Sequence, residues 1–88
     1  MQIKKYSAVA WHCSGCIQLQ KLIDDLPEEL TSGIESVNID EVPRQELATL
    51  KIRGVPLMIA FDDEGTEIGR LQGVPTKSVL EEFIQKYS

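Results

Sequence analysis

Cys13 and Cys16 are the residues of this chain best suited to chemistry, because its 88 residues contain no other cysteine. Ser14 and Gly15 separate them, and the motif lies between a short apolar run and an amphipathic helical pattern. A thiol at a helix start lies beside unpaired backbone N–H groups and the positive end of the helix dipole, and both favour the thiolate. A second thiol three residues later can close a disulfide with the first. The pair predicts redox chemistry or the binding of a soft metal ion.

A helix that begins at the cysteines separates their roles. Apolar residues follow at the spacing of one helix face: Leu19, Leu22, Ile23 and Leu26. They predict a helix over about residues 14–25 that ends near Pro27. Cys16 precedes Leu19 by three residues and is expected on the buried face, whereas Cys13 at the N-cap can meet solvent. We therefore predict that Cys13 is the nucleophile and Cys16 the resolving thiol.

Length, composition and charge limit the classes of protein to which this chain can belong. At 88 residues, with 42% hydrophobic and 26% charged residues, the chain is expected to form a single domain over residues 1–88. No apolar run approaches the roughly 20 residues that cross a membrane. The net charge of −5 argues against a nucleic-acid partner. Residues 1–5 lack the apolar core of a secretory signal, so a cytoplasmic location is expected. We also expect the protein to be a monomer.

Strands and helices are expected to alternate along the chain. Strand character is present at residues 3–10, 34–40, 57–61 and about 67–71. Pro43 is expected as the first residue of a short helix that turns Leu47 and Leu50 inward and ends at Lys51, Arg53 and Gly54. The strand, helix, strand order implies a right-handed crossover and two parallel strands.

The last third of the chain predicts a hairpin and a helix. Asp62, Asp63, Glu64 and Gly65 form the turn, whose acidic residues we interpret as a solvated tip rather than a metal site. Gly69 is expected to mark a β-bulge, because strict alternation would turn Ile68 and Leu71 to opposite faces. Thr76 can cap a final helix with one apolar stripe: Val79, Leu80, Phe83, Ile84 and Tyr87. The predicted order is βαβαββα.

Three segments in this order resemble the thioredoxin family. They are Trp11-His12-Cys13-Ser14-Gly15-Cys16 on a strand-to-helix turn, Asn38-Ile39-Asp40 after the second strand, and Ile52-Arg53-Gly54-Val55-Pro56 before the hairpin. The likeness covers almost the whole chain, which is similar to a thioredoxin without the usual first strand and helix and so has the length typical of glutaredoxins. The resemblance implies an α/β fold with a four-stranded mixed sheet flanked by three helices.

The resemblance also implies a substrate site. In that family the proline that matches Pro56 is cis and faces the cysteines, and the backbone of the residue before it, here Val55, pairs with an extended substrate. Gly73 matches the glycine beside the docking surface, and Val74 is expected to add an apolar contact. Trp11, on the cysteine turn, is expected to shield the disulfide and contact partners, although a core role is open.

Several residues depart from the family pattern. Thioredoxins usually have Trp directly before the first cysteine, where this chain has His12, and Gly-Pro between the cysteines. The redox potential therefore cannot be transferred. The family's buried acid aligns with Ser7, which cannot accept the proton of the resolving thiol in the same way, so water or solvent would have to do so. His12 is either an electrostatic aid to the Cys13 thiolate or a solvated turn residue.

The predicted activity is dithiol–disulfide exchange with client proteins through Cys13 and Cys16. No metal or organic cofactor is required, since the cysteine pair is itself the redox centre. The resemblance implies that a flavoprotein or ferredoxin-linked reductase supplies the electrons, and a small thiol is the other possible source.

Two other functions are open. A glutathione-dependent glutaredoxin is favoured by chain length, but Gly73-Val74-Pro75-Thr76 lacks that family's glutathione-binding signature. The cysteine motif also looks like the start of a metallochaperone domain that carries Cu(I), yet that fold is βαββαβ, and the helix after Pro43 does not fit it. Structural zinc needs about four ligands, and only Cys13, Cys16 and His12 are evident.

Overall fold

A mixed β-sheet places the two cysteines at one of its ends. The computed structural model describes residues 1–8 and 13–87, and within them four strands pair in the order β2-β1-β3-β4. The elements are β1 (Gln2–Ser7), α1 (Ser14–Asp24), α2 (Glu28–Thr31), β2 (Ile34–Asn38), the 3₁₀ helix η1 (Ile39–Glu41), α3 (Arg44–Thr49), β3 (Leu57–Phe61), β4 (Glu67–Gln72) and α4 (Lys77–Tyr87). β1 is parallel to β2 and antiparallel to β3, which is antiparallel to β4. The predicted fold class is confirmed, and the predicted strands and helices occur in the predicted order, with α2 and η1 as additional short helices.

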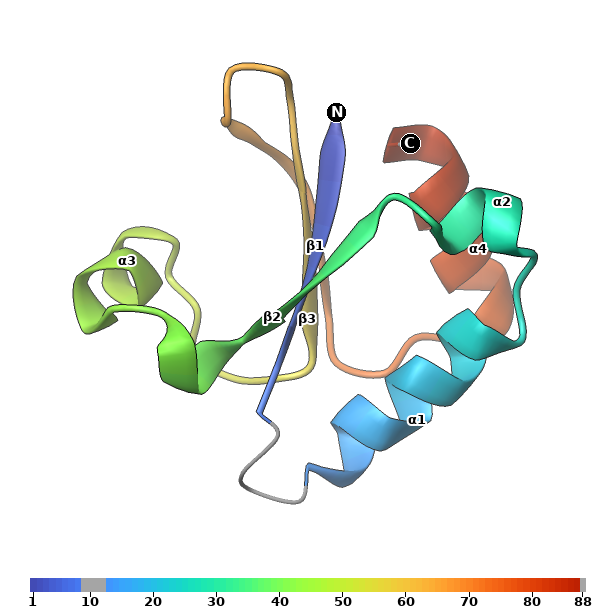
Figure 1. Cartoon of the computed structure of the whole chain (residues 1–88), viewed down its shortest axis with the longest axis horizontal. Helices are drawn as coiled ribbons and strands as arrows, with labels where there is room; N and C mark the ends of the chain where they lie inside the picture. Colours follow the sequence, from blue (N-terminus) through green and yellow to red (C-terminus); the bar gives the residue numbers. More distant parts are fainter. Residues whose placement is uncertain (9–12, 88) are drawn as a thin grey trace.

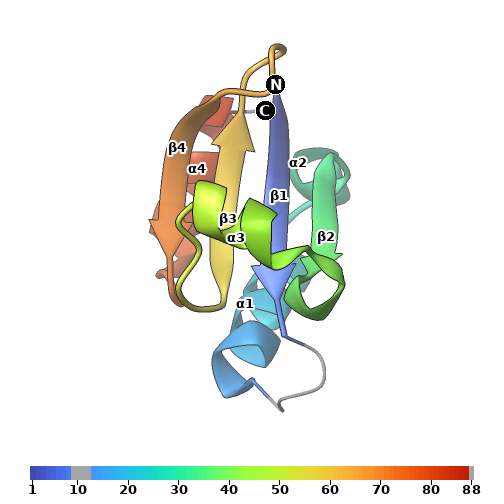
Figure 2. The same cartoon turned by 90° about the vertical axis from the view of Figure 1, so that its left-hand side faces the viewer.

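Helices cover both faces of the sheet. α1, α2 and α4 lie on one face and α3 on the other, as Figure 1 shows with the sheet seen edge-on and Figure 2 shows with α3 in front of the strands. Each face has its own apolar cluster, with Ile3 of β1 in the α1 and α4 cluster and Tyr6 in the cluster under α3. β3 is buried along its whole length, as expected for a central strand covered on both faces. None of the helices in the described segments is long and apolar enough to span a membrane.

The chain between α1 and β2 contains one helix more than predicted. Pro27 ends the first helical pattern as expected, but it also serves as the N-cap of the four-residue α2. Glu28 and Glu29 lie in the first turn of α2, where the helix dipole favours negative charge. Leu30 packs against the core. A single turn is too short to produce a periodic apolar pattern, so the sequence did not reveal it.

β1 and β2 are shorter than predicted. β1 ends at Ser7, and Ala8 lies outside the strand although it is buried; residues 9–10 of the predicted strand lie outside the described residues. β2 ends at Asn38, whose side-chain oxygen accepts a hydrogen bond from the backbone N–H of Asp40 at 3.2 Å. This local bond competes with the sheet ladder and turns the chain into η1.

The ends of α3 also differ from the prediction. Pro43 is the N-cap and not the first helical residue. The helix ends at Thr49, and Lys51 (φ +56°), rather than Gly54, adopts the left-handed conformation that follows it. Arg53 and Gly54 therefore belong to the segment that leads to β3. A lysine in this conformation breaks the usual preference for glycine after a helix, which is why the prediction placed the end too late.

The β-bulge lies one residue before Gly69. Ala60 pairs with Gly69 and Phe61 with Glu67, so Ile68 is the extra residue. Gly69 is needed for a different reason: an added Cβ there would lie 2.5 Å from Cζ of Tyr87 on α4. The predicted cap of α4 is confirmed, because Thr76 Oγ1 accepts a hydrogen bond from Val79 N at 3.3 Å.

Candidate functional site

Cys13 and Cys16 form a disulfide at the first turn of α1, with their Cα atoms 5.2 Å apart. Cys13 is the N-cap of the helix, and its sulfur accepts a hydrogen bond from the backbone N–H of Cys16 at 3.1 Å. That N–H is one of the groups at a helix start that have no partner within the helix. A donor aimed at the Cys13 sulfur, together with the helix dipole, stabilises negative charge on that atom in a reduced protein.

The two sulfur-bearing residues differ in the grooves that they line rather than in burial. Both are half-buried, so the expected burial of Cys16 beneath an exposed Cys13 does not appear as a difference in exposure. Cys13 lines two grooves, one that reaches α3 and one beside α1, whereas Cys16 lines only the second among the grooves described. Access from two grooves is compatible with the predicted role of Cys13 as the attacking thiol.

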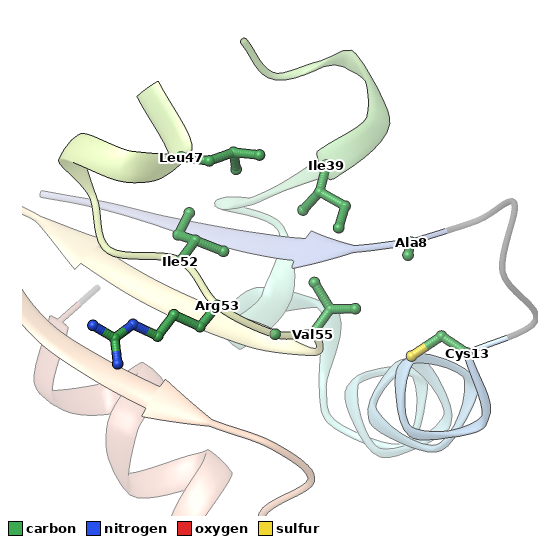
Figure 3. A pocket seen from close by; sticks show the side chains of 8 residues that line it. Ala8, Cys13, Ile39, Leu47, Ile52, Arg53 and Val55 are labelled. Atoms are coloured by element: carbon green, nitrogen blue, oxygen red, sulfur yellow. The ribbon is translucent and has the colours of Figure 1, made fainter. Parts of the chain in front are cut away.

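The first groove is apolar and runs from Cys13 toward α3. It has a volume of about 380 Å³ and is lined by Ala8, Cys13, Ile39, Leu47, Ile52, Arg53, Gly54 and Val55. Figure 3 shows the Cys13 sulfur at one end of the groove, Val55 and Ile39 near its middle, and the Arg53 guanidinium at the far end. The groove can take an apolar side chain next to a reacting sulfur.

Pro56 lies directly against the cysteine turn. The Val55–Pro56 peptide bond is cis, and it is the only cis bond within residues 1–8 and 13–87, so Val74–Pro75 is trans. A Cβ added to Gly15 would lie 3.0 Å from Cδ of Pro56 and 3.4 Å from Cγ2 of Val74. Gly15 thus lets the turn approach both residues closely. Sequence analysis missed this role, although a glycine between two cysteines was a signal for close backbone approach.

Gly73 and Gln72 hold the segment around Pro56. The backbone N–H of Gly73 (φ +80°) donates to the Pro56 carbonyl oxygen at 2.9 Å. The Gln72 side-chain amide donates to the same oxygen at 3.2 Å and to the Gly54 carbonyl oxygen at 3.4 Å. Gln72 was not among the predicted site residues, because its role depends on the pairing of β4 with β3 and leaves no local signal.

The predicted substrate-binding residues are thus brought together around the disulfide, except for Trp11. Val55 lines the apolar groove, Pro56 and Val74 lie against Gly15, and Gly73 bonds to Pro56. Val74 is 42% exposed, which leaves it open to contact. Trp11 lies outside the described residues, as does His12, which was considered as an aid to the Cys13 thiolate.

The second groove contains a buried cation that sequence analysis did not identify. Lys5 on β1 is 6% exposed and lines this groove with Ser7, Cys13, Cys16, Ile17 and Gln20. Its ammonium donates to the side-chain oxygen of Gln20. Desolvation lowers the pKa of Lys5, and the charge of Asp24 opposes this shift. Lys5 lies two residues after Ile3, and alternate residues of a strand point to the same face. This spacing indicated that the Lys5 side chain points inward.

The acidic hairpin tip lies at the opposite end of the sheet from the cysteines, as Figure 1 shows. Asp62 accepts hydrogen bonds from the backbone N–H groups of Glu64 and Thr66, each at 2.9 Å. Exposed Asp63 accepts a hydrogen bond from the N-terminal ammonium at 2.7 Å, which lowers its pKa. The tip is therefore an organised turn. Among the described residues no group of three or more His, Cys, Asp or Glu side chains is placed to hold a metal ion.

Comparison with known proteins agrees with this geometry. The family model for thioredoxin matches residues 5–86. The chain is similar in structure to thioredoxin from Plasmodium falciparum, at 22% identity and a TM-score of 0.78, covering 99% of this chain and 85% of that one. It is also similar to thioredoxin 1 from Thermosipho africanus, at 25% identity and a TM-score of 0.73, covering 99% and 93%. No curated protein gives a significant match.

The family match and the cysteine geometry support the same general chemistry. A thioredoxin fold with a cysteine pair at the start of its first helix is the arrangement of a thiol–disulfide oxidoreductase. Because the family model covers nearly all of the sequence, the chain belongs to the thioredoxin family.

Proposed function

We propose that this protein is a small thioredoxin-like protein disulfide oxidoreductase that donates electrons to disulfides of client proteins. The observation that carries the proposal is the hydrogen bond from the Cys16 N–H to the Cys13 sulfur at the N-terminus of α1. This arrangement favours a thiolate on Cys13, and the thiolate is the species that attacks disulfides.

The reaction transfers two electrons in two exchange steps. In the first step the Cys13 thiolate attacks one sulfur of a client disulfide; the client bond breaks, a bond between Cys13 and the client forms, and the other client sulfur leaves as a thiolate that takes a proton from water. In the second step Cys16 loses its proton to water and its thiolate attacks the Cys13 sulfur. The Cys13–Cys16 bond forms and the second client sulfur leaves as a thiolate. The client is reduced and the protein is oxidised.

Client proteins are proposed to bind as extended segments beside Val55 and Pro56. The backbone of Val55, in the segment before β3, can pair with an extended client backbone, and the apolar groove can take a neighbouring side chain. Val74 and Gly73 are proposed to contact the client on the other side of Pro56. Trp11 keeps its proposed role as a shield of the disulfide.

The remaining components are also proposals. The redox centre needs no metal or organic cofactor, because the disulfide itself carries the electrons. A flavoprotein or ferredoxin-linked reductase, or a small thiol, restores the dithiol after each cycle. We propose that the protein works as a monomer in the cytoplasm, without a nucleic-acid or membrane partner.

Insulin reduction with dithiothreitol as the electron source tests the activity. Catalysed precipitation of the insulin B chain is the expected result, and an inactive protein would contradict the proposal. The same preparation can be tested with glutathione, glutathione reductase and a small mixed disulfide, where turnover would indicate a glutaredoxin. Tight stoichiometric Cu(I) binding without disulfide turnover would indicate a metal carrier.

Two cysteine variants test the assigned roles. Cys16→Ser is expected to accumulate mixed disulfides with clients, because the first step proceeds and the second cannot. Cys13→Ser is expected to trap none, because it lacks the attacking sulfur. Equal trapping by both variants, measured by non-reducing electrophoresis, would contradict the assignment.

A further inference from the structure

Lys5 is the one charged side chain among the buried residues that the structure describes. It lies in the middle of β1, between Met58 of β3 and Ser36 of β2 in the register of the sheet. Its side chain extends from the same face as Ile3, toward α1. A buried ammonium loses its hydration, which costs free energy. A lysine at such a position therefore needs a compensating hydrogen-bond partner or has a functional role.

The partners of Lys5 lie on α1, just beyond the cysteines. Its ammonium donates to the side-chain oxygen of Gln20, which is one helical turn after Cys16. The amide nitrogen of Gln20 donates in turn to Asp24 at 2.9 Å. Gln20 therefore fixes the Lys5 ammonium from the helix side, within the groove that Cys16 also lines.

We propose that Lys5 is a positioning residue for the redox pair, whose buried positive charge stabilises thiolate at Cys16 and so speeds release of the client and raises the reduction potential. The inference rests on the proposed function. No electron or proton passes through Lys5: Cys16 still gives its proton to water in the groove, and the ammonium acts only through its field.

The sign of the effect follows from the charges of the two redox states. The disulfide is neutral, whereas the reduced pair carries negative charge once a thiolate forms, so a nearby cation stabilises the reduced state. The position of the family's buried acid is held by Ser7, which leaves no carboxylate there to neutralise the ammonium. The charge of Lys5 is thus available to the sulfur atoms.

Few other charged groups of the described residues face this cluster. Asp24 on α1 faces Lys5 and raises its pKa against the effect of burial. The neighbours on β2 and β3, Ser36 and Met58, are uncharged, and α2 contributes Thr31 to the adjoining groove. Arg53 lines the other groove, on the Cys13 side; His12 lies outside the described residues.

The test uses the full chain and a pair of adjacent lysines. Lys5→Met removes the charge and keeps a long apolar side chain, whereas Lys5→Arg keeps the charge. Lys4→Met is the matched control, because Lys4 lies on the opposite face of β1, with its ammonium 5.6 Å from the Phe61 ring centroid and 4.0 Å from Glu35. The Cys13–Cys16 equilibrium is measured in glutathione buffers from pH 5 to pH 9.

Lys5→Met is expected to shift this equilibrium toward the disulfide by about fivefold near pH 8, from a charge interaction of roughly 1 kcal/mol. That shift corresponds to about 20 mV for a two-electron couple. The shift shrinks as the pH falls, because protonation of the thiolates removes the negative charge that Lys5 stabilises. Lys5→Arg and Lys4→Met are expected to stay close to the unmodified protein.

Three results would overturn the inference: an unchanged equilibrium in Lys5→Met, an equal shift in Lys4→Met, or a shift that does not vary with pH. If Lys5→Met does not fold, NMR titration of the unmodified protein decides instead. The pKa of Lys5 must then be higher in the dithiol form than in the disulfide form, and equal values would contradict the proposal.

These measurements need no client protein. A pH-dependent shift in a protein that fails to reduce insulin would uphold the inference about Lys5 and contradict the proposed client reaction. A protein that reduces insulin but shows no shift in Lys5→Met would support the proposed client reaction and contradict the inference about Lys5.

Discussion

The tripeptide Gly-Val-Pro occurs twice, and the two copies have different structures, although both lie next to the cysteine turn. In residues 54–56 the Val–Pro bond is cis, Pro56 is buried, and the glycine has no positive φ. In residues 73–75 the bond is trans and Gly73 has φ +80°. The copies meet, because the Gly73 N–H donates to the Pro56 carbonyl oxygen. Identical local sequence therefore takes its conformation from the neighbouring strands, and both copies contribute to one site.

Gly15→Val should disturb both copies at once and have the largest effect. The added side chain would meet Pro56 and Val74, for which even a Cβ lies at 3.0 Å and 3.4 Å. We expect a loss of about 1–3 kcal/mol in the free energy of unfolding, as for overpacked sites, together with a marked fall in insulin reduction. Chemical denaturation and the insulin assay measure the two effects.

Gly33→Val is the matched control for Gly15→Val, since no atom lies within 4 Å of a Cβ added at Gly33. It is expected to change stability by less than about 0.5 kcal/mol and to leave insulin reduction unchanged. Similar losses in both variants would show that the close approach at Gly15 is not what limits substitution.

The two glycines of the tripeptides should respond differently to alanine. Gly73→Ala forces a side chain into the left-handed region and is expected to cost about 1–2 kcal/mol of stability. Gly54→Ala meets only the Gln72 amide at 3.9 Å and should be close to neutral. Thermal or urea denaturation checks both, and equal costs would mean that the difference in φ does not matter energetically.

Substitutions of the two valines should distinguish a residue that packs in the fold from one that is exposed to a client. Val55 packs against the cluster under α3 and lines the apolar groove, so Val55→Ala should cost about 1 kcal/mol of stability and also raise the KM for a client protein. Val74 is 42% exposed, and Val74→Ala should raise KM with little change in stability. Steady-state kinetics with insulin and denaturation midpoints distinguish these outcomes; a KM unchanged in both variants would remove the valines from the client site.

Among the variants expected to lose stability, the smallest loss is expected for Gln72→Ala, which breaks the link between the copies. Gln72→Ala removes hydrogen bonds to the Gly54 and Pro56 carbonyl oxygens, and the exposed position lets water replace them. We expect a loss of about 0.5–1 kcal/mol. Faster amide hydrogen exchange at Gly73 would report a loosened contact, and a cost above that of Gly73→Ala would contradict this order.

Sequence patterns predicted the parts of the molecule whose signals are local. The apolar spacing from Leu19 to Leu26 predicted α1, and the Thr76 hydroxyl predicted the start of α4; both depend on residues within a few positions of each other. The element boundaries were less accurate. β2 ended early because the Asn38 side chain formed a local turn, and α3 ended at a left-handed lysine where a glycine was expected.

The candidate site likewise contains residues that local sequence patterns could predict and residues that they could not. The cysteine pair at a helix start was evident from spacing, whereas Pro56 and Val55 were assigned through a family resemblance and not from their own neighbourhood. Gly15, Gln72 and Lys5 were missed as site residues. Each acts through a contact with a distant segment, and single-sequence patterns carry no information about such contacts.

By itself, the sequence determined where a cysteine pair begins a helix, because helix periodicity, capping and the helix dipole operate within one or two turns of chain. Only the tertiary structure decided that Pro56 and Val74 press against the cysteine turn and that Lys5 shares a groove with Cys16. Those relations arise from strand order and register, which are set by burial of both sheet faces over the whole chain.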